Sequence, residues 1–323
     1  MLSLALVIAY LSSIGAAFFA MVSGYTLIPH LSIEPVKETL RQLPELIFRL
    51  DIPPVVSVMT ALVLAIMIGL ATVWTKSEVF ENLLDNFQKM VLLLINRILI
   101  PILPFFIAAN FCALSYEGAI TKQLPVFLGV MVIVIISQFV WLSFLYVLAG
   151  AVSKKNPWQV LKYYGPAYLT AVGTMSSAAT LAVIDFAIPL FSNIHLCGSI
   201  LTEVFFVMTV SLMLYGSLPS LTVMILFIIL LGIFAIGAPG VPGGTVIASL
   251  GIVISILGFD EAGTALLLTI FALQDSFGTA CNITGDGALT LIMTKASGHR
   301  STKHPLQDKI HKDTPDFHNK GYY

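Results

Sequence analysis

Long apolar runs, separated by short polar segments, occupy most of the 323 residues. A run of about 20 apolar residues is long enough for an α-helix to cross a bilayer. The runs therefore predict membrane-spanning helices at residues 2–28, 52–75, 90–113, 124–152, 188–216 and 262–294. Because transmembrane β-strands alternate apolar and polar side chains and these runs do not, the sequence predicts an all-α polytopic membrane protein.

The composition excludes several classes of protein. Hydrophobic residues make up 58% of the chain, charged residues make up 10%, and the mean hydropathy is +0.96, so a soluble globular protein is excluded. A net charge of −1 provides no clustered basic face, and we expect no nucleic-acid partner. Cys112, Cys197 and Cys281 are odd in number and widely spaced, which argues against a disulfide framework or a zinc site. We expect no cofactor and no enzymatic activity.

Charged segments set the predicted topology. Residues 31–51 and 76–89 mix charges with apolar positions, in the pattern of helices that lie at the membrane surface. Three lysines follow the run at 124–152, and the tail at 295–323 is polar and basic, so the positive-inside rule assigns both to the cytoplasm. The lysines are Lys154, Lys155 and Lys162. No basic segment precedes the first run, so we expect a retained helix rather than a cleaved signal, in a multi-pass protein of the plasma (inner) membrane.

Two segments inside the apolar runs contain small, helix-breaking residues. They are Gly173–Thr180 and Gly237–Thr245. Irregular backbone at membrane depth is tolerated only where it is buried in protein or lines a cavity, and paired interruptions indicate the binding site of a transporter. We therefore predict re-entrant helical hairpins around residues 165–186 and 226–258. The alternative is a pair of kinked helices that pack through their small residues.

The last apolar run carries the clearest candidate chemistry. Residues 163–294 contain acidic side chains but no Lys or Arg, so a site at membrane depth here concerns cations, protons or cationic groups. Asp275, Thr279, Asn282 and Asp286 follow the spacing i, i+4, i+7 and i+11, which brings them within about 60° of one another on a helix. Such residues mark ion or substrate paths; the alternative is carboxyls held protonated by neighbouring hydroxyls. The two aspartates lie about 16 Å apart along the axis, too far for an aspartyl protease dyad.

Two further polar residues lie on the preceding run. His195 fits a packed, hydrogen-bonded histidine better than a proton carrier. Glu203 fits either a cavity-facing or an interfacial carboxylate, and the sequence leaves that choice open.

Three segments together resemble the dicarboxylate/amino acid:cation symporters, the family of the glutamate transporters. They are Thr174–Leu181, Ile236–Gly244 and Asn282–Asp286, in that order. The resemblance implies an elevator fold, in which a domain of two hairpins and two helices carries substrate across a homotrimeric scaffold in contact with membrane lipid. It assigns residues 1–162 mainly to the scaffold and 163–294 to the transport domain. Residue 1 matches the family's fourth helix, which implies that the first three helices are lacking.

The resemblance also implies a site for a small molecule, an amino acid or a dicarboxylate, with Na⁺ and/or H⁺ as the coupling ion. Asp275 matches the carboxylate that receives the substrate amino group, and Thr279 and Asn282 match its other polar contacts. Asp286, with the backbone of Asn282, matches a sodium site. The residues that match the substrate cradle between the hairpin tips are Ser176, Ser177, Gly240 and Val241.

Departures from the family pattern change the expected substrate and ions. Gly278 stands where acidic amino acid transporters carry an arginine, and Met175 stands where some prokaryotic members carry an alternative one, so a neutral amino acid is favoured. The segment His195–Ser199 lacks the side-chain oxygens of one sodium site, which implies fewer sodium ions or proton coupling. The predicted function is secondary active symport. The alternatives are an inactive or truncated remnant, and an ion or anion channel on the same scaffold.

Overall fold

The computed structural model describes residues 2–31, 33, 44, 56, 58–116, 119–154, 156–174, 180, 191–238 and 243–296. Helices dominate these residues and no β-strand occurs among them, so the all-α prediction is confirmed for the described part of the chain. Within that part, four helices are long and apolar enough to cross a membrane. They are Ser3–His30, Leu124–Ser153, Cys197–Tyr215 and Glu261–Ala296.

In chain order the described elements run from α1 to α12. Their bounds are α1 (Leu2–Leu27), η1 (Ile28–His30), α2 (Val58–Thr75), α3 (Glu78–Leu94), η2 (Ile95–Leu99), α4 (Ile100–Tyr116), α5 (Ala119–Ser153), α6 (Pro157–Thr174), α8 (Phe191–Ile194), α9 (Cys197–Tyr215), α10 (Leu221–Gly237), α11 (Gly244–Leu257) and α12 (Glu261–Ala296).

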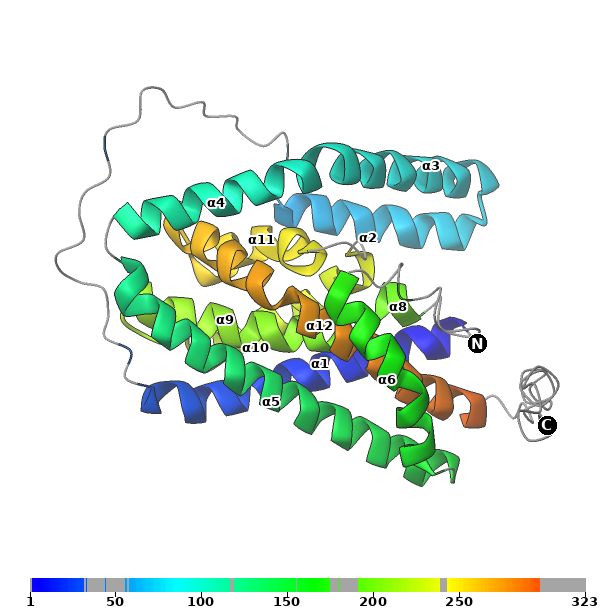
Figure 1. Cartoon of the computed structure of the whole chain (residues 1–323). Helices are drawn as coiled ribbons and strands as arrows, with labels where there is room; N and C mark the ends of the chain where they lie inside the picture. The colour runs from blue at the N-terminus through cyan, green and yellow to red at the C-terminus, as the bar shows by residue number, and fades with distance from the viewer. Residues whose placement is uncertain are drawn as a thin grey trace, which may run out of the picture.

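The helix α12 is the central element of the structure. It contacts α4, α5, α6, α8, α9 and α11, and it runs diagonally through the middle of the view in Figure 1. The helices α1 and α5 lie along the lower side of this view, and α2, α3 and α4 form a layer along the upper side. The side chains of α12 are therefore within reach of elements from both halves of the chain.

The largest apolar core joins α1 and α5 to α9, α10, α11 and α12. The helix α9 is buried from Cys197 to Ser211, as expected for a helix that is apolar all round and enclosed by others. On α1, the Tyr25 hydroxyl donates a hydrogen bond to the carbonyl of Pro219 at 2.6 Å, which ties α1 to the segment before α10. Although α1 and α5 come early in the chain, they pack in the same core as its last helices.

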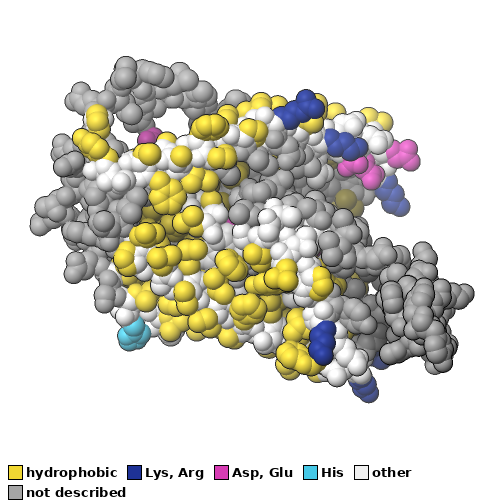
Figure 2. All heavy atoms as spheres, in the orientation of Figure 1, with side chains coloured by type: hydrophobic (Ala, Val, Ile, Leu, Met, Phe, Trp, Pro, Cys, Tyr) yellow, Lys and Arg dark blue, Asp and Glu magenta, His cyan; other side chains and the backbone are white. Residues whose placement is uncertain are grey.

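The outer surface is apolar where a soluble protein would be polar. Yellow apolar side chains cover much of the visible face over α1 and α5 in Figure 2, and charged side chains gather toward the ends of the molecule. On α5, the exposed side chains include Val132, Ile136, Phe139 and Val147, which recur at helical spacing along one side. An apolar surface of this extent fits a membrane protein.

The predicted span at 90–113 is not one regular α-helix. The π-turn η2 interrupts it, and this turn precedes Pro101 and Pro104. Pro101 has no N–H to donate to the carbonyl of Arg97, so regular i to i−4 pairing cannot continue through this turn. The proline thus acts on the turn before it, and the apolar run is divided between α3 and α4. Residues 78–89 of the predicted surface helix form the first part of α3.

The predicted span at 188–216 is not one continuous helix. Among its described residues, α8 ends at Ile194, His195 and Leu196 are not helical, and α9 begins at Cys197. Leu196 has φ −124° and ψ 43°, outside the helical region. The apolar pattern gave no sign of this break, which follows from a side chain on α12 described below.

The second predicted hairpin, at 226–258, corresponds to α10 and α11, which pack against each other. At 17 and 14 residues they are about 25 and 21 Å long, shorter than the hydrocarbon core of about 30 Å. For the first hairpin, at 165–186, the structure describes α6 and Thr180, and residues 175–179 and 181–186 lie outside the described residues. The re-entrant placement of both stays a prediction.

Two glycines, Gly198 on α9 and Gly278 on α12, allow these helices to approach closely. A Cβ added at Gly198 would lie 2.4 Å from Cys281 Cβ and 2.5 Å from the carbonyl oxygen of Gly278. Close approach through small residues is the usual packing device between membrane helices, since lipid offers little hydrophobic drive for association.

We predict that Gly198→Ala destabilises the protein, because the carbonyl of Gly278 is backbone and cannot move aside as a flexible side chain would. Overpacking of this kind costs about 1–3 kcal/mol, which should appear as a lower unfolding temperature of the purified protein in detergent. The matched control is Gly129→Ala on α5, where an added Cβ meets nothing within 4 Å. Equal unfolding temperatures for the two variants would contradict the prediction.

Candidate functional site

The four polar residues predicted to share one face of the last helix are all buried on α12. Their exposed fractions are 5% for Asp275, 6% for Thr279, 2% for Asn282 and 0% for Asp286. Polar groups buried in an apolar core need partners. The side chains of Asp286, Asn282 and Asp275 find partners in the α8–α9 break, in α9 and at the start of α11.

The side chain of Asp275, on α12, lies next to the start of α11. Its Oδ2 accepts a hydrogen bond from the backbone N–H of Gly243 at 2.7 Å. Gly243 has φ +70°, a left-handed conformation that favours glycine, and it directly precedes the first residue of α11. The first amides of a helix form its positive end, where an anion is stabilised. The carboxylate of Asp275 is therefore held by the positive end of α11.

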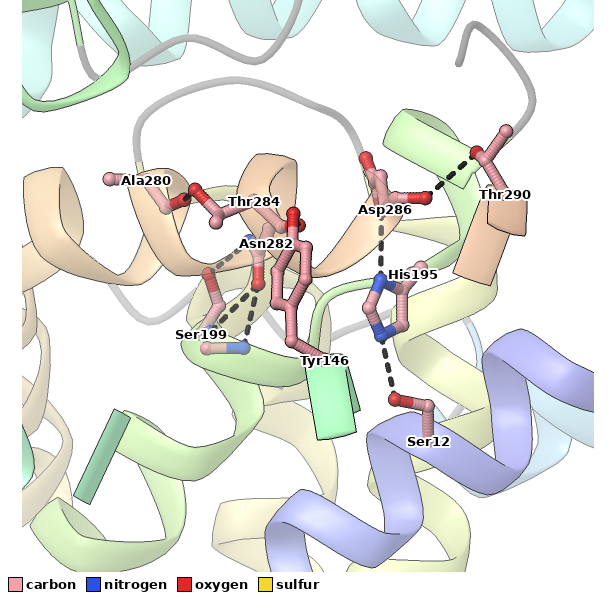
Figure 3. Close-up of polar contacts among 10 residues, drawn as sticks. Ser12, Tyr146, His195, Ser199, Ala280, Asn282, Thr284, Asp286 and Thr290 are labelled. Carbon is pink, nitrogen blue, oxygen red and sulfur yellow. Dashed lines mark hydrogen bonds and ion pairs between the residues drawn. The ribbon is translucent and has the colours of Figure 1, made fainter. Parts of the chain in front are cut away.

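Asn282 caps α9 from another helix. Its Oδ1 accepts hydrogen bonds from the backbone N–H groups of Gly198 at 2.7 Å and Ser199 at 3.2 Å, and its Nδ2 donates to Ser199 Oγ at 2.9 Å (Figure 3). Amides in the first turn of a helix have no partner within their own helix. This contact explains why a new helix begins at Cys197. It also engages the side-chain oxygen of Asn282 with two amides of α9.

Asp286 and His195 form a fully buried pair. His195 Nδ1 lies 2.8 Å from Asp286 Oδ1, and His195 Nε2 lies 2.9 Å from Ser12 Oγ on α1. Figure 3 shows the imidazole between the aspartate and the serine, so the contacts connect α12, the α8–α9 break and α1. The interpretation of His195 as a packed, hydrogen-bonded histidine agrees with this geometry.

Glu203 is fully buried inside the protein. Its Oε1 accepts a hydrogen bond from the hydroxyl of Ser249 on α11, while Oε2 has no hydrogen-bond partner among the described residues. One turn of α9 away from Ser199, this carboxylate joins α9 to α11.

The oxygen atoms around Asp286 bear on the expected sodium site, because sodium is a hard cation that takes oxygen ligands. Asn282 Oδ1 and Asp286 Oδ1 already lie on nitrogen partners. Asp286 Oδ2 is buried and has no hydrogen-bond partner in the part of the chain that the structure describes. A buried carboxylate oxygen without a partner is costly unless a cation or proton meets it, so Asp286 fits a cation site through Oδ2. No group of three or more His, Cys, Asp or Glu among the described residues could hold a metal ion.

Four predicted site residues lie outside the described residues. They are Ser176, Ser177, Gly240 and Val241. Thr279 lies on the same face of α12, between Asp275 and Asn282.

Sequence reasoning missed the roles of Ser12 and of the Gly198 and Ser199 amides. The pair Ser12–Ser13 is the available signal, because it places two hydroxyls in the middle of an uncharged apolar run. His195, the partner of Ser12, is 183 positions away along the chain, so sequence spacing alone does not connect the two residues.

Comparison with known proteins identifies relatives of this chain. A family model described as the sodium:dicarboxylate symporter family matches residues 1–184 and 182–296. Excitatory amino acid transporter 1 of Homo sapiens is 26% identical over 242 residues, which cover 69% of this chain and 43% of the relative. Putative sodium-dependent excitatory amino acid transporter glt-4 of Caenorhabditis elegans is 25% identical over 258 residues, which cover 74% and 50%. The chain thus spans half of these relatives' length or less.

The family match extends over both halves of the chain, and it includes the segments whose motifs carried the resemblance. The chain belongs to the sodium:dicarboxylate symporter family.

Proposed function

We propose that this chain is a secondary active transporter that couples the entry of a neutral amino acid to sodium across the plasma membrane. The observation that carries the proposal is the buried polar face of α12, where the carboxylate of Asp275 meets the start of α11 and Asn282 meets the start of α9. An amino acid presents an ammonium group and a carboxylate. A buried aspartate complements the first, and helix N-termini complement the second.

The proposed roles follow this complementarity. Asp275 receives the amino group, Thr279 and the side-chain amide of Asn282 contact the rest of the substrate, and Asp286 with the backbone of Asn282 holds the sodium ion. The proposed cradle between the hairpin tips comprises Ser176, Ser177, Gly240 and Val241.

A neutral substrate is supported by the charges available near the face. Residues 163–294 contain no Lys or Arg, so they offer a second substrate carboxylate no cationic side chain. Gly278 stands where the resemblance leads us to expect an arginine in transporters of acidic amino acids. A Cβ at this position would lie 3.3 Å from Ser199 Oγ, so the close approach of α9 and α12 also favours glycine there.

The transport movement we propose is that of an elevator in a homotrimer in contact with membrane lipid. Helices α10 and α11, each too short to cross the hydrocarbon core, support a re-entrant hairpin at 226–258. The proposed moving part comprises residues 163–294. Because α1 and α5 share one apolar core with α9 to α12, we propose that these two helices move with it. Residues 1–162 otherwise provide the scaffold.

Reconstituted protein is predicted to accumulate a radiolabelled neutral amino acid inside liposomes above the external concentration when sodium is high outside. Asp275→Asn should lower this uptake about 10- to 100-fold, because it removes a hydrogen bond to a charged group worth about 1.5–3 kcal/mol. The amide still offers an oxygen to the Gly243 N–H, so the variant should fold. The matched control is Glu261→Gln, which removes one negative charge at the exposed start of α12.

Uptake that stops at the external concentration would contradict symport and indicate a channel, since a channel cannot concentrate its solute. Uptake by Asp275→Asn equal to that by the Glu261→Gln control would remove Asp275 from the site.

The substrate class is predicted to be neutral. In competition against labelled serine, unlabelled alanine and serine should reduce uptake, while aspartate, glutamate and succinate at the same concentration should not, because no cation from residues 163–294 meets their second carboxylate. Stronger competition by aspartate or glutamate than by alanine would overturn the neutral preference and leave symport standing.

A further inference from the structure

His195 has no role in the function proposed so far, although it touches one of its central residues. The imidazole is fully buried in the non-helical segment between α8 and α9, with Asp286 Oδ1 at 2.8 Å on one side and Ser12 Oγ at 2.9 Å on the other. Both ring nitrogens are therefore engaged, each by a different helix (Figure 3).

The directions of these hydrogen bonds depend on the tautomer of the ring. When Asp286 is ionised it only accepts hydrogen bonds, so Nδ1 carries the proton, and a neutral imidazole then accepts at Nε2 from the hydroxyl of Ser12. In that arrangement the ring is uncharged, and Asp286 has a negative charge that needs a counter-ion.

The position of the imidazole is also restricted sterically. A Cβ added at Gly285 on α12 would lie 2.9 Å from His195 Cε1 and 3.1 Å from Cys197 Sγ. The glycine thus lets the ring lie directly against the α12 backbone, next to the aspartate. At Thr284, the residue before Gly285, the backbone carbonyl accepts a hydrogen bond from the Tyr146 hydroxyl at 2.9 Å, which ties α12 to α5.

We propose that His195 is a positioning residue for the coupling cation. Held by Ser12, its Nδ1–H occupies Asp286 Oδ1 and leaves Oδ2 as the oxygen that meets sodium. The fully buried Oδ2, which has no hydrogen-bond partner among the described residues, supports this arrangement, because the contact with His195 satisfies only one of the two oxygens of the aspartate. Carboxylates that bind metals are commonly oriented by a second hydrogen-bonding residue in this way. The inference rests on the proposed sodium symport and specifies how the chain builds its cation site.

The test measures sodium binding apart from transport. The unfolding temperature of the full chain in detergent is recorded against sodium chloride, with choline chloride keeping the ionic strength constant, and the midpoint of the stabilisation reports sodium affinity. Loss of an orienting partner typically lowers metal affinity 10- to 100-fold. We therefore expect His195→Ala to raise the sodium midpoint by about that factor, and Ser12→Ala to raise it less.

His195→Asn provides a second variant in case His195→Ala fails to fold. Its amide retains an N–H donor for Asp286, so it should hold the midpoint nearer that of the unsubstituted chain than His195→Ala does. The matched control is Thr209→Val on α9, which removes a buried hydroxyl that bonds within its own helix to the carbonyl of Phe205. This variant should leave the midpoint unchanged.

Each result separates this inference from the proposed function. An unchanged midpoint in His195→Ala, or in Ser12→Ala if His195→Ala does not fold, with sodium-driven uptake intact in the unsubstituted chain, would overturn the role of His195 alone. A lower midpoint, meaning tighter sodium binding, would also overturn it and would show that the imidazole takes the place of a cation. Absence of sodium stabilisation in the unsubstituted chain would overturn both this inference and the sodium coupling.

Discussion

Helices that begin inside an apolar core have N–H groups in their first turn that need acceptors, and this requirement organises the centre of the protein. Water supplies such acceptors at a surface but not in the hydrocarbon region of a membrane. An unpaired buried donor costs about 1–3 kcal/mol. Here α9 and α11 both start in the core, and α12 provides their acceptors through Asn282 and Asp275.

The same side chains of α12 thereby serve two purposes. They stabilise the starts of two helices, and they bring a carboxylate, an amide and helix N-termini onto one buried face, which complements the zwitterionic substrate proposed above. A purely apolar α12 would leave the Gly198 and Ser199 amides of α9 without the acceptor that Asn282 provides. The polar face is therefore needed for the fold as well as for the proposed site, and substitutions there have to preserve an acceptor if the two roles are to be separated.

The sequence predicted those features that depend on local spacing. The shared face of Asp275, Thr279, Asn282 and Asp286 follows from the period of a helix, and the structure buries all four. The break at 195–196 was not predicted, because its cause is Asn282, far away in the chain, rather than a local glycine or proline. In the same way, the contacts of His195 with Asp286 and Ser12 depend on how α1 and α12 pack around the start of α9. Near Pro101, the irregular turn lies before the proline, since a proline cannot pair with the carbonyl four residues earlier.

Asn282 and Asp286 are one helical turn apart, and they contact Gly198 and His195, which lie on either side of the start of α9. These two contacts fix both the rotation and the height of α12 relative to α9. Adding or removing one residue between them would turn one side chain by about 100° and shift it by about 1.5 Å relative to the other. Both contacts could not then form together. This stretch of α12 is thus constrained in length more strongly than in composition, and a single-residue insertion there would disrupt the cap of α9 and the proposed cation site in one step.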